Sequence, residues 1–168
     1  MQDDVNYENF VNVVQSGSER LVIASHAFAS ASFPNTNESG IVLSGDEFNV
    51  NYITASEIAQ LNINSDWVVL SACNTGFNIF NYSKNYSSLA KAFLAAGVNS
   101  VLVSNWSIET TTSSKITKDI FNNVWFDEDI SKHEALKKAS ESLRKDLSND
   151  YFIHPAFWGG YSIVYNSI

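Results

Sequence analysis

The single cysteine of the chain and one of its three histidines follow apolar runs in the same manner. Cys73 comes shortly after Trp67-Val68-Val69-Leu70, and His26 ends the run Leu21-Val22-Ile23-Ala24-Ser25. Both runs are typical of buried strands. If the two strands are parallel neighbours, the thiol and the imidazole meet at the edge of the sheet where ligands usually bind. The pair is therefore a candidate Cys-His dyad, in which the imidazole promotes thiolate formation and the thiolate attacks a carbonyl carbon.

Attack on a carbonyl also requires donors for the oxyanion that forms. The backbone N–H groups of Cys73 and of Ala27, the residue after His26, are the candidates for this role. From the residues alone a packing role for Cys73 stays open, because free cysteine is among the most often buried residue types.

Hydrophobic periodicity and turn residues predict a doubly wound α/β sheet that would carry these groups. Helices are predicted over about 6–16, 54–58, 88–96, 109–124 and 131–147, and strands over 21–25, 41–43, 48–50, 67–71, 100–104 and 161–165. Residues 27–40 and 77–87 are predicted to be long loops. The strand-helix-strand order over 67–104 predicts a right-handed crossover, which makes strands 67–71 and 100–104 parallel.

Composition limits the classes of function. A chain of 168 residues fits one domain over residues 1–168, and its net charge of -8 argues against nucleic-acid binding. One cysteine and no paired histidines at ligand spacing predict no metal site, and the proposed chemistry requires no cofactor. The acidic start and the lack of a long apolar run predict a cytoplasmic protein with no membrane segment.

Several motifs together resemble the C-terminal part of a CHAT domain, a caspase-like, clan CD cysteine peptidase family related to separase. The spacing from His26 to Cys73 is close to that of caspases, about 50 residues. The resemblance runs from about Leu21 to Val164, and its blocks are Ile23-Ala24-Ser25-His26, Val68-Val69-Leu70-Ser71-Ala72-Cys73-Asn74-Thr75-Gly76, the segment Ser88 to Val101, Ser104-Asn105-Trp106-Ser107-Ile108-Glu109 and His154-Pro155-Ala156-Phe157-Trp158.

The resemblance implies a caspase-like three-layer sandwich with a mostly parallel central sheet. It also implies a cysteine endopeptidase in which Cys73 attacks the scissile carbonyl, His26 protonates the leaving amine, and the amides of Ala27 and Cys73 hold the oxyanion. The substrate would lie along Ser104, Asn105, Trp106 and Glu109. Glu109 would then favour a basic residue at the cleaved position, although an acid that stabilises a helix N-terminus is the alternative interpretation.

Two departures from the family pattern keep other functions open. Ala27 stands where the family usually has glycine, and fewer elements than usual precede His26. The second departure implies a longer protein, in which an N-terminal segment or a partner would complete the sheet and regulate the site. The alternatives to an endopeptidase are a catalytically inactive CHAT-like module that binds a peptide or partner, and a Cys-His acyltransferase or amidase.

Overall fold

The computed structural model describes residues 6–28, 37–45, 50–71, 88–126, 129–146, 148 and 150–166. The helices are α1 (Tyr7–Val14), α2 (Ala55–Ala59), α3 (Ser88–Ala95), α4 (Thr110–Phe126), α5 (Lys132–Lys145), the 3-10 helix η1 (Asp150–Ile153) and α6 (Pro155–Trp158). The strands are β1 (Arg20–Ile23), β2 (Ala27–Phe28), β3 (Gly40–Gly45), β4 (Val50–Thr54), β5 (Trp67–Leu70), β6 (Ser100–Ser104) and β7 (Tyr161–Tyr165).

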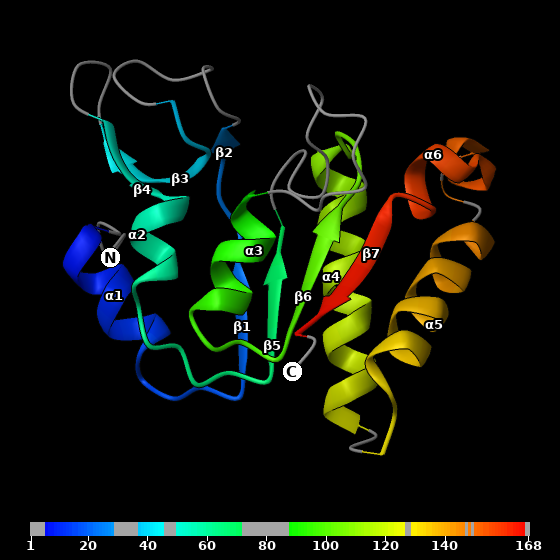
Figure 1. The fold of residues 1–168 in the computed structure, drawn as a ribbon. Helices are drawn as coiled ribbons and strands as arrows, with labels where there is room; N and C mark the ends of the chain where they lie inside the picture. The colour runs from blue at the N-terminus through cyan, green and yellow to red at the C-terminus, as the bar shows by residue number, and fades with distance from the viewer. Residues whose placement is uncertain are drawn as a thin grey trace.

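The described strands form two sheets. The central sheet has the order β1-β5-β6-β7, in which β1, β5 and β6 are parallel and β7 is antiparallel to β6. The small antiparallel sheet β2-β3-β4 lies beyond the carboxyl ends of the parallel strands, as Figure 1 shows. Strand β1 leads into the small sheet through residues 24–26, at the edge of the central sheet that the sequence predicts for the dyad.

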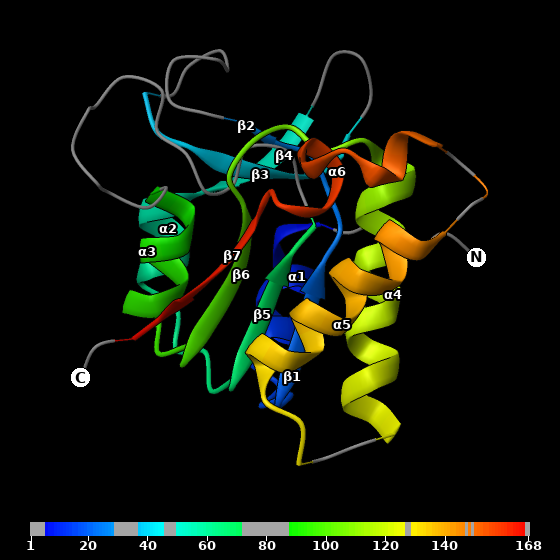
Figure 2. The ribbon, with the colours of Figure 1, turned by 90° about the vertical axis from the view of Figure 1, so that its right-hand side faces the viewer.

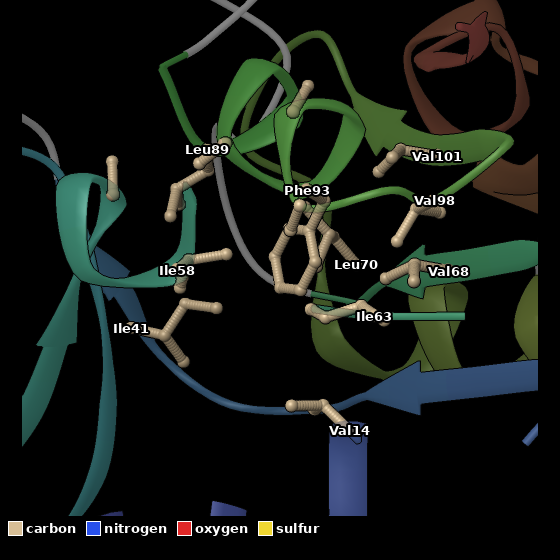
Figure 3. Packing of buried hydrophobic residues seen from close by; sticks show 14 of the residues in the cluster. Val14, Ile41, Ile58, Ile63, Val68, Leu70, Leu89, Phe93, Val98 and Val101 are labelled. Atoms are coloured by element: carbon tan, nitrogen blue, oxygen red, sulfur yellow. The ribbon is translucent and has the colours of Figure 1, made fainter. Parts of the chain in front are cut away.

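Helices cover both faces of the central sheet and complete a three-layer arrangement (Figures 1 and 2). One core packs α1, α2 and α3 against one face, with Phe93 and Val68 fully buried at its centre (Figure 3). The other core packs α4 and α5 against the opposite face around Trp67, Ile116 and Ile120. Strand β5 is buried along its whole length, as is expected for a parallel strand covered on both faces.

The short helices begin and end at residues suited to those positions. The side chain of Asn6 accepts the N–H of Asn9 at the start of α1, and Thr54 forms a capping box with Glu57 at the start of α2. Gly97, after α3, takes a φ of 109°, a conformation that favours glycine. Gly97 thus marks the end of α3, before the chain enters β6.

The predicted parallel pairing of strands 67–71 and 100–104 is confirmed, and so is the adjacency of the two strands that lead to His26 and Cys73. Three details differ. The second strand of the hairpin is described from Val50 to Thr54, whereas residues 48 and 49 of the predicted strand lie outside the described residues. Two residues of the predicted 27–40 loop form β2, and the C-terminal region contains η1 and α6, which the periodicity did not predict. In the described part of the chain, no helix combines the length and apolarity needed to cross a bilayer.

Candidate active site

His26 lies between β1 and β2, directly beyond the carboxyl end of β1. Strand β1 pairs with β5 in parallel, with Ile23 opposite Leu70, and the Ser71 amide continues this pairing by donating to the Ile23 carbonyl at 3.0 Å. His26 is the third residue after Ile23, as Cys73 is the third after Leu70. Cys73 itself lies outside the described residues.

The small sheet fixes the backbone on both sides of the His26 side chain. The Val42 amide donates to the His26 carbonyl at 2.8 Å, and the Ser25 hydroxyl donates to the Val42 carbonyl. The imidazole is solvent-exposed. His26 is therefore held by its main chain, while its ring is accessible from the solvent.

The register of β2 with β3 determines where the Ala27 amide points. Ala27 is opposite Ile41, one residue beyond the pair in which His26 and Val42 share a hydrogen bond. Hydrogen-bonded and non-hydrogen-bonded pairs alternate along antiparallel strands, so the N–H of Ala27 points away from β3. Among the described strands β2 is an edge of its sheet, and that N–H therefore points to the side where no described strand pairs with it. The extended backbone of β2 is accessible to alanine, so glycine-only angles are not required at this position.

A cavity of about 390 Å³ lies beside His26 at the carboxyl ends of β1, β5 and β6. Its lining is dominated by small and hydroxyl-bearing residues: Ala24, Ser25, His26, Ser71, Ser104, Ile108, Thr110, Ser113 and Ser114. The hydroxyl groups of Ser71 and Ser113 are hydrogen-bonded to each other at 2.9 Å, which joins the end of β5 to the first turns of α4. None of the described lining residues is Asp, Glu, Lys or Arg.

The segment after β6 is braced by the C-terminal part of the chain. The Asn105 amide donates to the Gly160 carbonyl at 2.6 Å, and the Trp106 indole N–H donates to the Ala156 carbonyl at 2.8 Å. His154 caps α6 by accepting the Ala156 amide on Nδ1 at 3.1 Å. The motif from His154 to Trp158 therefore has a structural role, because it binds the segment that follows β6.

Glu109 is committed to the start of α4. Its carboxylate accepts the amides of Thr111 and Thr112 at 3.1 and 3.0 Å and the Thr112 hydroxyl at 3.0 Å. The hydrogen bond from Thr111 contributes most to lowering the pKa of Glu109 to about 2, whereas burial acts to raise this pKa. This contact fits the helix-terminus interpretation of Glu109.

The structure brings together some of the residues that the sequence singles out. His26 and Ser104 line the cavity, whereas Asn105, Trp106 and Glu109 are not among its described lining residues. Sequence reasoning missed Ser71 and Ser113. Their signal is present in the chain as a hydroxyl-rich run, Thr110-Thr111-Thr112-Ser113-Ser114, at the start of a helix that follows a strand of the sheet. Among the described residues, no cluster of His, Cys, Asp and Glu has the arrangement of a metal site.

The comparisons with known proteins agree with this architecture. The family profile of the CHAT domain matches residues 1–166. Tetratricopeptide repeat protein 28 of Mus musculus is 25% identical over 112 residues, which cover 67% of this chain and 4% of the mouse protein. Tetratricopeptide repeat protein 28 of Homo sapiens is 26% identical over 112 residues, again 67% of this chain and 4% of that protein. This chain thus spans a small fraction of these relatives, while the family match extends over nearly all of it. The chain belongs to the CHAT domain family, whose fold is caspase-like.

Proposed function

We propose that this domain is a cysteine endopeptidase in which Cys73 is the nucleophile and His26 is its acid-base partner. The observation that carries the proposal is the parallel pairing of Ile23 with Leu70. His26 is three positions after Ile23, and Cys73 is three positions after Leu70. Ser71 lines the same cavity as His26. Cys73 follows Ser71 by two residues, and two residues of chain span at most about 7 Å.

In the proposed reaction the thiolate of Cys73 attacks the scissile carbonyl and forms a tetrahedral intermediate. The outward amide of Ala27 and the amide of Cys73 would hold its oxyanion. His26 gives a proton to the leaving amine, and a thioester with the N-terminal part of the substrate remains. Water then attacks the thioester carbonyl and His26 takes a proton from that water. The C–S bond breaks, the N-terminal product leaves as its carboxylic acid, and the thiolate and the protonated His26 are restored. A reducing compartment belongs to the proposal, because the thiol must stay unoxidised.

The test is a search for cleavage that depends on Cys73. A pool of unstructured peptides is incubated with the wild-type chain, Cys73→Ser and His26→Ala, and new peptide termini are identified by mass spectrometry. The proposal expects new termini with the wild type and their loss in both variants. The same termini with Cys73→Ser, or none with the wild type, would contradict it.

Among the described strands β1 is an edge of the central sheet, which favours a second candidate function, the binding of an extended polypeptide segment without catalysis. The carbonyls of Glu19 and Ile23 accept hydrogen bonds from the β5 side, so in a parallel pair the backbone groups of Val22 and Ala24 point the other way. That side faces a groove of about 700 Å³ between α1, β1 and β3. The exposed side chains of Val13 and Val22 lie along it.

An added strand would satisfy both the outward backbone groups and the apolar groove, and a regulatory partner or an N-terminal segment of a longer protein would supply it. Amide hydrogen exchange tests the surface itself. Leu21 and Ile23 are expected to exchange slowly and Val22 and Ala24 quickly in the isolated chain. Equal protection of all four amides would mean that the edge is already occupied.

A further inference from the structure

The cavity beside His26 differs in chemistry from the acidic subsite that the sequence suggests at Glu109. Its described lining offers hydroxyl groups from the segments that follow β1 and β5, from β6 and from α4. It also has one buried apolar side chain, Ile108, and no carboxylate or cationic side chain apart from the imidazole. A cavity at this place, between His26 and the strand end that leads to Cys73, would receive the side chain of the residue that precedes the scissile bond.

The hydrogen-bonded hydroxyls of Ser71 and Ser113 can both donate a hydrogen bond to a neutral polar group and accept one from it. Each hydroxyl has one hydrogen and two lone pairs, and their mutual bond at 2.9 Å uses one of the two hydrogens. The other hydrogen and the remaining lone pairs can pair with an incoming amide or hydroxyl. A side chain that carries both a donor and an acceptor therefore fits the pair better than an alkyl chain, which would leave it unsatisfied.

A basic side chain would lose hydration in the cavity without gaining an opposite charge from the described lining, and an acidic side chain would find only the His26 imidazole there. Glu109 has both carboxylate oxygens occupied by the first turn of α4 and does not belong to the described lining. Burial of a charge without a partner costs several kcal/mol.

We propose that the subsite selects a small, uncharged, hydrogen-bonding side chain, of the Asn, Ser or Thr kind, at the position before the scissile bond. This inference rests on the proposed function for its place in the reaction, and it concerns the binding chemistry of the cavity. Ser71, Ser113 and Ser114 are the residues that would determine the specificity.

Binding is measured with the Cys73→Ser chain, so that catalysis does not interfere. Fluorescent peptides that differ only before the scissile bond, with Asn, Arg, Asp or Leu, are titrated by anisotropy. The Asn peptide is expected to bind at least about tenfold more tightly than the Arg and Asp peptides, a difference of about 1.4 kcal/mol. In the added Ser114→Asp variant the Arg peptide is expected to become the tightest ligand. Ser114 is exposed on α4, so this change is compatible with folding.

Ser107→Asp is the matched control, because Ser107 is an exposed serine outside the described cavity lining. It should leave the order of affinities unchanged. Three results would overturn the inference: tightest binding of the Arg peptide with loss in Glu109→Gln, tightest binding of the Asp peptide, or no measurable binding of any peptide. Selective binding of the Asn peptide without cleavage by the wild type would leave the inference standing and reject the peptidase. Cleavage after Arg by the wild type would support the peptidase and reject the inference about the subsite.

Discussion

Ala27 stands where the family usually has glycine, and its backbone conformation shows whether glycine is required at this position. A glycine would be needed if its backbone required a positive φ, but Ala27 lies in the extended strand β2. Its N–H is directed away from β3, since the hydrogen-bonded pairs are those on either side of it. At the scale of the residue, the oxyanion donor of the proposed reaction is thus compatible with alanine.

The role of this amide can be tested by removing it. Ala27→Pro deletes the N–H at a position where β3 does not use it, and proline is tolerated on edge strands at such positions. The rate of Cys73-dependent cleavage is expected to fall about 10²- to 10³-fold, the usual cost of losing one oxyanion donor. Ala27→Gly is the control and should retain activity. Unchanged cleavage by Ala27→Pro, with a native circular dichroism spectrum, would remove Ala27 from the proposed mechanism.

At the scale of the element, the segment that leaves β6 depends on a close approach of the C-terminal turn. A Cβ at Gly160 would lie 2.5 Å from Ile108 Cδ1 and 2.8 Å from Trp106 Cε2. Glycine at this position therefore lets the chain between α6 and β7 pack directly against the loop after β6. Because Ile108 also lines the cavity, this contact links the C-terminal motif to the candidate site.

Gly160→Ala is expected to push this segment away from the cavity. Overpacking of this kind typically costs about 1–3 kcal/mol, which urea unfolding would detect as a lower midpoint. The peptide affinity of the Cys73→Ser chain should fall in the same variant. Ser107→Ala, in the same segment but exposed, should change neither quantity. A Gly160→Ala protein with wild-type stability and affinity would show that the segment adapts without cost.

The sequence predicts the long elements well because each has its own signal. The apolar run of β5 and the periodicity of α5 are local patterns, and Thr54 and Gly97 mark helix ends through their own capping chemistry. Strand β2 has only two residues, and it exists because of its long-range pairing with β3, which no local pattern encodes.

The candidate site is predictable only in part for the same reason. The apolar runs place His26 and Cys73 after strands, but whether those strands are neighbours depends on the strand order, which the pairing of β1 with β5 supplies. Ser113 could not be placed in the cavity from the sequence, because its contact with Ser71 joins a helix to a strand far away along the chain.

At the scale of the whole molecule, the two ends of the central sheet are held by different chemistry. At the amino ends of the strands, Lys132 Nζ lies 2.8 Å from the Asp66 carboxylate and donates to the Ser100 hydroxyl at 2.7 Å. This network ties α5 to β5 and β6, far from the cavity at the carboxyl ends. Stability and specificity can therefore be altered separately.

Two carboxylates predict how stability depends on pH. Burial would raise the pKa of Asp66, but hydrogen bonds from Lys132 and Asn99 outweigh it and lower that pKa, and hydrogen bonds from Thr111 lower the pKa of Glu109 to about 2. A group with a lowered pKa in the folded state stabilises the protein above its unfolded pKa of about 4 and loses this effect as the pH falls towards the folded value.

The urea midpoint is therefore expected to decrease as the pH is lowered from 6 to 3. Glu109→Gln should cost about 1 kcal/mol at pH 6, the usual value of a helix cap, and less at pH 2, where the wild-type carboxyl is itself partly protonated. Glu141→Gln, on the exposed side of α5, is the control and should leave the dependence unchanged. A wild-type midpoint that is constant between pH 6 and 3 would contradict this account.

The account as a whole depends on Cys73 and His26 working as a pair, and the alkylation rate of Cys73 measures this most directly. The chain has no other thiol, so mass spectrometry can follow modification by iodoacetamide from pH 5 to 9 without ambiguity. If the two side chains form a dyad, the wild type is modified rapidly well below the ordinary thiol pKa of about 8.5, and His26→Ala returns Cys73 to ordinary thiol behaviour. Slow modification with the same pH dependence in both proteins would contradict it.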